Sequence, residues 1–127
     1  ARKKIESLPE GQADFQVGDI ENLPYENKSI DATLTARFFH LVPASLRPKV
    51  YAELGRITKS RIILCFNCNK WSLKILSKRI RGMNSPYWMS RKELTQELND
   101  AGLKVLEILT KGGPLSTLWV VVCEPSA

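Results

Sequence analysis

The sequence lacks an apolar run long enough to cross a bilayer, and its longest one, near the C-terminus, is far shorter than a spanning helix requires. Basic residues open the chain in ARKKIESLPEG, but no apolar stretch follows them, so we expect no signal peptide. The three cysteines are odd in number and unevenly spaced, unlike a disulfide framework. We therefore expect a cytoplasmic protein with reduced thiols.

The composition is that of one globular domain. The chain has 127 residues, of which 43% are hydrophobic and 25% charged, so disordered and fibrous classes are set aside. We expect a single domain over residues 1–127. The net charge of +6 favours encounters with anions such as phosphate, nucleic acid or lipid headgroups, but it does not name a partner.

Alternating apolar patterns predict an α/β fold. The expected strands are 15–18, 30–36, 61–66, 103–109 and 115–124, and the expected helices are 43–57, 71–81 and 90–101. The 61–66 stretch, RIILCF, is almost continuously apolar, which is typical of a strand buried on both faces. The paired glycines of TKGGP, residues 110–114, suit a tight reversal between the last two strands, which would make an antiparallel hairpin.

The first long helix has a recognisable start and one apolar face. Ser45 is a suitable N-cap, and Pro48 falls in the first turn, where its missing N–H costs little. Leu46, Val50 and Leu54 follow at intervals of four residues and share a face. We expect this face to pack on the sheet.

The last helix carries clear signals at both ends. Ser90 and Glu93 have the spacing of a capping box, and Gly102 is a natural left-handed residue after the C-terminus. Leu94 and Leu98 lie between them on one face. The sequence therefore predicts a capped amphipathic helix.

Three segments carry a family resemblance: GDIENLPYENKSIDATLTARFFHLV, YAELGRITKSRIILCF and ELTQELNDAGLKVLEI. In this order and spacing, followed by a terminal hairpin, they resemble the second half of a class I S-adenosylmethionine-dependent methyltransferase. The resemblance implies a Rossmann-like sheet, incomplete here, and S-adenosyl-L-methionine as the cofactor. It also implies methyl transfer by direct displacement to an acceptor that the sequence does not identify. No catalytic residue is assigned, and no metal is expected.

The resemblance assigns the cofactor's adenine to Asp19 and Ile20. The acid would accept a hydrogen bond from the exocyclic amine, and the Ile20 N–H would donate to a ring nitrogen. Adenine presents a donor beside an acceptor, which matches this pair, whereas guanine presents the reverse. The alternative is that Asp19 only ends a strand or caps a turn.

The resemblance places Thr35, Ala36 and Arg37 beside the methionine half of the cofactor. Phe38 and Phe39 would shape the wall of the site, although a place in the core is an equal alternative for Phe39. Ligands of open α/β sheets bind at the carboxyl ends of the strands, where both groups of residues would lie.

The remaining reactive side chains favour structural roles. Asp31 is expected to hold a turn or loop, and the single histidine, His40, is more typical of a hydrogen-bonded junction than of a base or ligand. Cys65 lies within an apolar strand, which favours a small buried hydrophobe over a redox pair with Cys68. A zinc site built from Cys65, Cys68, Cys123 and His40 is a remote alternative.

The predicted helix over 71–81 is basic and amphipathic, with Lys70, Lys74, Lys78, Arg79 and Arg81 near Trp71. It occupies the position of the family's substrate-covering segment. The alternatives are a solvated basic face and a surface that binds RNA or another nucleic acid, with stacking on Tyr87 and Trp88. We favour the covering segment and expect no membrane contact.

Two departures from the family concern the cofactor and the sheet. TKSR, residues 58–61, replaces the usual Pro-Gly-Gly turn, and none of the seven glycines lies in a Gly-x-Gly pattern. The glycine-rich loop after the first strand and the ribose-binding acid after the second are both missing. We therefore expect a fragment or remnant that binds the cofactor poorly, with a non-enzymatic binding module as the alternative.

The family's strand order, third, second, first, fourth, fifth, seventh, sixth, predicts an open edge on the 30–36 strand once the first two strands are missing. Exposed edges of this kind promote association. Either the 15–18 strand moves in beside it, or a second copy pairs across it as a homodimer. We favour the homodimer.

Overall fold

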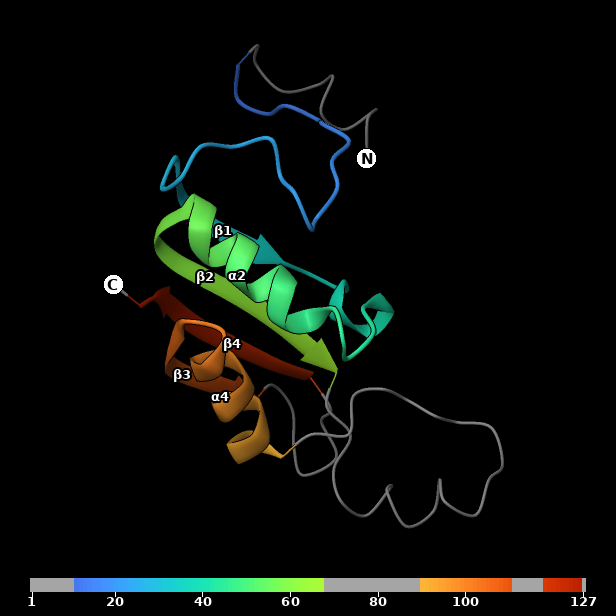
Figure 1. The fold of residues 1–127 in the computed structure, drawn as a ribbon, viewed down its shortest axis with the longest axis vertical. Coiled ribbons are helices and arrows are strands. Elements are labelled where there is room, and N and C mark those ends of the chain that lie inside the picture. The colour runs from blue at the N-terminus through green and yellow to red at the C-terminus, as the bar shows by residue number, and fades with distance from the viewer. Residues whose placement is uncertain (1–10, 68–89, 111–117, 127) are drawn as a thin grey trace.

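The computed structural model describes residues 11–67, 90–110 and 118–126 (Figure 1). The elements in chain order are β1 (Ile30–Thr35), η1 (Phe39–Leu41), α2 (Arg47–Ile57), β2 (Thr58–Asn67), α4 (Arg91–Asp100), β3 (Leu103–Thr110) and β4 (Leu118–Pro125). The predicted basic helix over 71–81 and most of the predicted reversal over 110–114 lie outside the described residues. This combination of helices and strands confirms the α/β class.

The four strands form one mixed sheet in the order β1-β2-β4-β3. β1 and β2 are parallel, whereas β4 runs antiparallel to both β2 and β3. The strands correspond to the family's fourth, fifth, seventh and sixth, so the predicted order and the terminal antiparallel pair are confirmed. β1 and β3 are the two edges of this sheet.

The predicted strand at 15–18 is wrong. Residues 13–18 have no regular structure, and the only pairing nearby is an isolated bridge between Asp19 and Asn22. Phe15 is 52% exposed and Val17 is 86% exposed. A strand needs a neighbour for its backbone groups, and the described residues offer none, since this segment does not move in beside β1.

Helix α2 begins one residue later than the N-cap prediction requires. The N-cap residue is Leu46, which makes no side-chain cap, so the prediction for Ser45 is wrong. The Leu46 N–H instead closes a turn onto the Pro43 carbonyl at 3.0 Å, and Pro48 falls in the first turn as predicted. Leu46 is 37% exposed and therefore does not share the buried face of α2.

Helix α4 confirms its predicted signals. The Ser90 N–H donates to Glu93 Oε2 at 2.6 Å, and the Glu93 N–H donates to Ser90 Oγ at 3.2 Å. Leu94 and Leu98 are fully buried, and Gly102 has a φ of 80° just beyond the helix. A left-handed residue costs least when it is glycine, so the chain can turn directly into β3.

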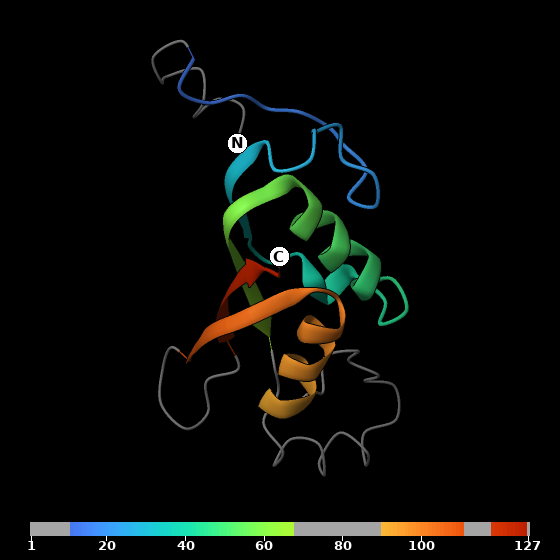
Figure 2. The ribbon, with the colours of Figure 1, turned by 60° about the vertical axis from the view of Figure 1, so that its left-hand side comes forward.

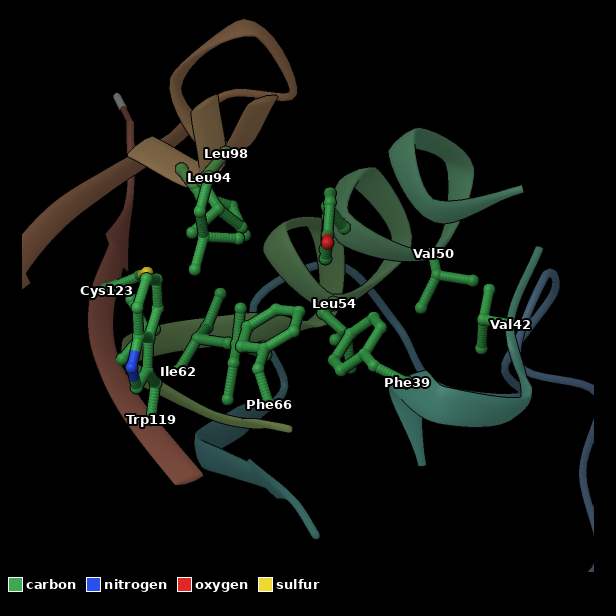
Figure 3. Close-up of a cluster of buried hydrophobic side chains, with 14 residues drawn as sticks. Phe39, Val42, Val50, Leu54, Ile62, Phe66, Leu94, Leu98, Trp119 and Cys123 are labelled. Carbon is green, nitrogen blue, oxygen red and sulfur yellow. The ribbon is translucent and has the colours of Figure 1, made fainter. Parts of the chain in front are cut away.

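Both helices cover the same face of the sheet (Figure 2). The core between them runs from Trp119 and Cys123 on β4 to Phe39 and Val42 beside α2 (Figure 3). An ion pair joins the two helices: Nε of the buried Arg47 on α2 lies 3.0 Å from Oε1 of Glu97 on α4. The Tyr51 hydroxyl donates a hydrogen bond to the same carboxylate.

The other face of the sheet is only partly covered by the described residues. On β2, Ile62, Leu64 and Phe66 are buried under the helices, whereas the alternate residues Ile63 and Cys65 are half-exposed. Within the described part of the chain, the expectation that this strand is buried on both faces is therefore wrong. Its apolar residues were predicted correctly, but the number of covering layers was not.

Candidate functional site

The candidate site begins in the loop that precedes β1. Part of this loop surrounds a hollow of about 260 Å³. Its lining is mainly apolar and comprises Gln16, Gly18, Ile20, Leu23, Pro24, Tyr25 and Phe38. Because Phe38 follows β1, the hollow joins the two segments that the sequence assigned to the cofactor.

Asp19 and Ile20 occupy a tight turn at this hollow. The Asp19 carboxylate accepts the Glu21 N–H through Oδ1 at 3.0 Å, and its backbone carbonyl accepts the Asn22 N–H at 3.0 Å. Oδ2 has no partner among the described residues, and neither does the Ile20 N–H. Asp19 therefore caps a turn, as in the alternative interpretation. Among the described residues, this role leaves its second carboxylate oxygen and the Ile20 N–H free.

A polar clamp from α2 holds this loop, and the sequence did not predict it. Glu53 accepts the Leu23 N–H at 2.8 Å and binds Arg56 through both carboxylate oxygens at 2.6 and 2.8 Å. Arg56 in turn donates to the carbonyls of Leu23 and Tyr25 at 3.1 and 2.7 Å, and to Asn27 Oδ1 at 2.9 Å. These contacts fix the loop on α2 where it has no strand partner.

The clamp perturbs the titration of its own members. Hydrogen bonds from Arg56 and from the Leu23 N–H, together with the Arg56 charge, hold the pKa of Glu53 below its usual range despite partial burial. The carboxylate raises the pKa of Arg56 in return, chiefly through the same hydrogen bonds. Both groups are therefore charged at neutral pH, and the loop is held by a permanent ion pair.

A second set of contacts fastens the end of the same loop. The Lys28 N–H donates to the Arg56 carbonyl at 2.8 Å, and its ammonium donates to the Gly55 carbonyl at 2.9 Å. Lys28 has a φ of 54°, so this turn adopts the left-handed conformation just before β1. Lys49 pairs with Glu21 at 2.6 Å on the surface near Asp19.

Thr35, Ala36 and Arg37 lie at the carboxyl end of β1, as predicted. Thr35 is 9% exposed, and its Oγ1 is buried with no hydrogen-bond partner among the described residues. Ala36 and Arg37 are exposed, and Arg37 has a φ of 53°. A non-glycine residue in this conformation marks a sharp change of direction after the strand.

The two phenylalanines have different roles. Phe38 is half-buried and lines the hollow, in agreement with the prediction for the wall. Phe39 is 1% exposed and stacks on Phe66 with centroids 4.8 Å apart, so it belongs to the core (Figure 3). Of the two alternatives for Phe39, the structure supports the core.

Asp31 lies within β1 rather than in a turn. Its side chain is 89% exposed and binds Lys59 at 2.7 Å, which lowers the pKa of Asp31 through the hydrogen bond and the charge. It does not line the hollow. The backbone of His40 belongs to η1, but its side chain lies outside the described residues.

The cysteines do not form a common site. Cys65 pairs with Val120 across the sheet, whereas Cys123 pairs with Ile62 on the helix-covered face. Side chains of opposite faces cannot bind one metal ion, and Cys68 lies outside the described residues. Burial raises the pKa of the Cys123 thiol to about 12. In residues 11–67, 90–110 and 118–126, no group of three or more ligating side chains is placed to hold a metal.

The hollow has the features that an adenine ring requires. Its walls are mainly apolar, which suits a flat aromatic ring, and Phe38 is one of the lining residues. The free Asp19 oxygen is an acceptor and the Ile20 N–H is a donor, so neighbouring groups complement the amine and ring nitrogen of adenine. The described residues thus fit the adenine part of the expected cofactor.

Comparison with known proteins gives a family match. The model of the family described as "Methyltransferase domain" matches residues 1–66. No curated protein matches the chain. The described helices are all too short or too polar to cross a membrane.

Solved structures share the fold at low sequence identity. A SAM-dependent methyltransferase from Methanosarcina mazei has a TM-score of 0.76 at 19% identity and covers 98% of this chain and 75% of its own. Magnesium protoporphyrin IX methyltransferase from Synechocystis PCC 6803, with bound SAH, has a TM-score of 0.75 at 18% identity. The match covers 98% of the present chain and 57% of the Synechocystis chain.

A further similar structure is a chain from the complex of the Haloferax volcanii Trm112 methyltransferase activator with a methyltransferase. Its TM-score is 0.72 at 16% identity, and it covers 99% of this chain and 67% of its own. The present chain thus spans between 57% and 75% of the length of these three proteins. This similarity confirms the predicted fold, a partial Rossmann-like sheet.

Proposed function

Because the chain belongs to the methyltransferase domain family, we propose that its loop and the end of β1 bind S-adenosyl-L-methionine for methyl transfer. The observation that carries the proposal is the acceptor and donor pair of Asp19 and Ile20, in a turn whose residues Gly18 and Ile20 line the mainly apolar hollow. When bound, the cofactor supplies the activated methyl group. The methyl acceptor stays unassigned, and we expect the protein to act in the cytoplasm.

The adenine edge is recognised by Asp19 and Ile20 in this proposal. The Asp19 carboxylate accepts a hydrogen bond from the exocyclic amine while its other oxygen keeps the turn closed. The Ile20 N–H donates to the adjacent ring nitrogen. Phe38 covers one side of the ring and excludes water from these bonds, which strengthens them.

The backbone of residues 35–37 faces the methionine half of the cofactor in the same proposal. The buried Thr35 hydroxyl supports it, because a hydroxyl without a partner among the described residues has hydrogen-bonding capacity to give to a ligand or to water. The clamp of Glu53 and Arg56 holds the adenine-binding loop against α2. It positions this loop and does not contact the cofactor itself.

We expect the 127-residue chain to bind the cofactor weakly. The contacts that the described residues offer are mainly to adenine, and a few hydrogen bonds of about 0.5 to 1.5 kcal/mol each do not offset the entropy of association. Isothermal titration calorimetry should therefore show no micromolar binding of S-adenosylmethionine. A micromolar affinity would mean that the ribose and methionine parts have further partners in this chain.

Nuclear magnetic resonance detects such weak binding and locates it. Adding S-adenosylhomocysteine to labelled protein should shift the amide signals of Gly18 to Ile20 and the ring signals of Phe38. Asp19→Ala should remove these shifts, whereas Glu21→Ala, which changes a neighbouring acid that pairs with Lys49 instead, should keep them. Shifts that persist in Asp19→Ala would contradict the adenine assignment.

A further inference from the structure

Arg37 carries a free positive charge just beyond the carboxyl end of β1. It is exposed, and its side chain makes no hydrogen bond, ion pair or ring contact with the other described residues. The remaining arginines of the described ranges each have an acidic or aromatic partner; they are Arg47, Arg56, Arg61 and Arg91. The guanidinium of Arg37 is therefore available to an anion from outside the chain.

The backbone at Arg37 is unusual as well. Only two non-glycine residues in the described ranges have a left-handed φ, Lys28 at 54° and Arg37 at 53°. Bonds to α2 hold Lys28 in this conformation, because its N–H and its ammonium both donate to carbonyls there. In the part of the chain that the structure describes, no side-chain bond does the same for Arg37. Residues kept in such a costly conformation cluster at ligand sites, so the turn at Arg37 points to binding.

The same turn places Arg37 at the edge of the sheet where ligands bind. β1 ends at Thr35, and ligands of open α/β sheets bind at the carboxyl ends of the strands. Phe38, the next residue, lines the hollow proposed for adenine, whereas Arg37 does not. A ligand with its adenine in the hollow therefore meets Arg37 with the part that extends beyond adenine.

Building on the proposed function, we propose that the Arg37 guanidinium binds the α-carboxylate of the cofactor's methionine part. This carboxylate is the only anionic group of S-adenosylmethionine, because its adenosyl part has no phosphate. The planar guanidinium offers two parallel N–H donors, which match the two oxygens of a carboxylate. Adenine and the carboxylate are then recognised by separate residues.

Two anchors orient the reactive group between them. The sulfonium and its methyl group lie between the adenosine and the carboxylate-bearing chain of the cofactor. With adenine held by Asp19 and Ile20 and the carboxylate held by Arg37, rotation about the bonds to sulfur is restricted. Orientation of this kind lowers the barrier to a displacement. Arg37 is thus a positioning residue, which takes no proton and does not touch the methyl group.

Two ligands that differ in one group give the test. Decarboxylated S-adenosylmethionine keeps the adenine, the ribose, the sulfonium and the amine, and lacks only the carboxylate. In nuclear magnetic resonance titrations of the labelled 127-residue chain, both ligands should shift the amide signals of Gly18 to Ile20. S-adenosylmethionine should bind about five- to tenfold more tightly, between the effect of an exposed ion pair and that of a hydrogen bond to a charged group. It alone should shift the Nε–Hε signal of Arg37.

Two variants separate Arg37 from the general field of a positively charged chain. The net charge of +6 by itself disfavours the decarboxylated ligand, which carries one more net positive charge. Arg37→Asn removes the guanidinium, tolerates the left-handed backbone and should abolish the preference. Arg61→Gln is the matched control, because it removes the same charge from an arginine on β2 that pairs with Glu124, and it should keep the preference. Circular dichroism checks that both variants are folded.

The outcomes distinguish the role of Arg37 from the proposed function. Equal wild-type affinities for the two ligands, with shifts at Gly18 to Ile20, would overturn this role and leave the adenine assignment standing. A preference that folded Arg37→Asn retains, or that Arg61→Gln also loses, would overturn it as well. The absence of shifts at Gly18 to Ile20 with either ligand would overturn both proposals.

Discussion

The clamp on the candidate site can be tested by replacing Glu53 with alanine. This change removes the acceptor of the Leu23 N–H and the partner of two Arg56 nitrogen atoms. The Glu53 side chain is 12% exposed, so solvent replaces these contacts only in part. A hydrogen bond to a charged group contributes about 1.5 to 3 kcal/mol, and we expect a loss of about 2 kcal/mol in the free energy of unfolding.

Calorimetry or circular dichroism would measure the effect. For a chain of this length a loss of about 2 kcal/mol lowers the melting temperature by about 8 °C. Glu53→Gln should cost less, because its amide oxygen still accepts the Leu23 N–H. Glu21→Ala is the matched control, since it removes an acid that pairs with an exposed lysine and should leave the melting temperature unchanged.

Hydrogen exchange separates the clamp from general stability. In Glu53→Ala the Leu23 amide should exchange faster by a larger factor than the amides of α4, because its own acceptor is lost. An unchanged melting temperature together with unchanged exchange at Leu23 would refute the argument that the clamp holds this loop.

Two further predictions concern pH and packing. The pKa of Glu53 is lower in the folded state, so its contribution to stability is complete above the unfolded pKa of about 4.3 and is lost as pH falls through the folded pKa. The difference in unfolding free energy between wild type and Glu53→Gln should therefore shrink in acid titrations. A difference that does not depend on pH would contradict this. Leu98→Ala should lower the free energy of unfolding by about 2 to 5 kcal/mol in denaturant titrations, because Leu98 is fully buried. Leu106→Ala, at a 41% exposed position, should cost far less. Equal costs for the two variants would contradict the described core.

The parts of the fold that were predictable from the sequence depend on local signals. The capping box at Ser90 and the left-handed Gly102 fix the ends of α4 through bonds between residues close in the chain, so the pattern alone was sufficient. β2 was recognised because its apolar run, RIILCF, is almost continuous. The start of α2 was missed because the Leu46 turn onto Pro43 competes with a cap at Ser45.

The parts that were not predictable depend on contacts between distant segments. The stretch at 15–18 alternates like a strand, but a strand forms only beside a partner, and that partner is not encoded in the stretch itself. The clamp joins α2 to a loop about thirty residues earlier, and Glu53 and Arg56 look like ordinary surface charges in sequence. Asp19 and Ile20 were found only through the family resemblance, because Gly-Asp alone is typical of turns.

The central claim is that Asp19 and Ile20 recognise the edge of adenine. Titrating the labelled protein with adenosine and with inosine tests it most directly, because inosine replaces the exocyclic amine with an oxygen and turns the neighbouring ring nitrogen into a donor. We predict that adenosine binds about tenfold or more tightly than inosine, judged from the shifts of the Ile20 amide, and that Asp19→Ala removes this preference. Equal affinities for the two nucleosides in the wild-type chain would contradict the claim.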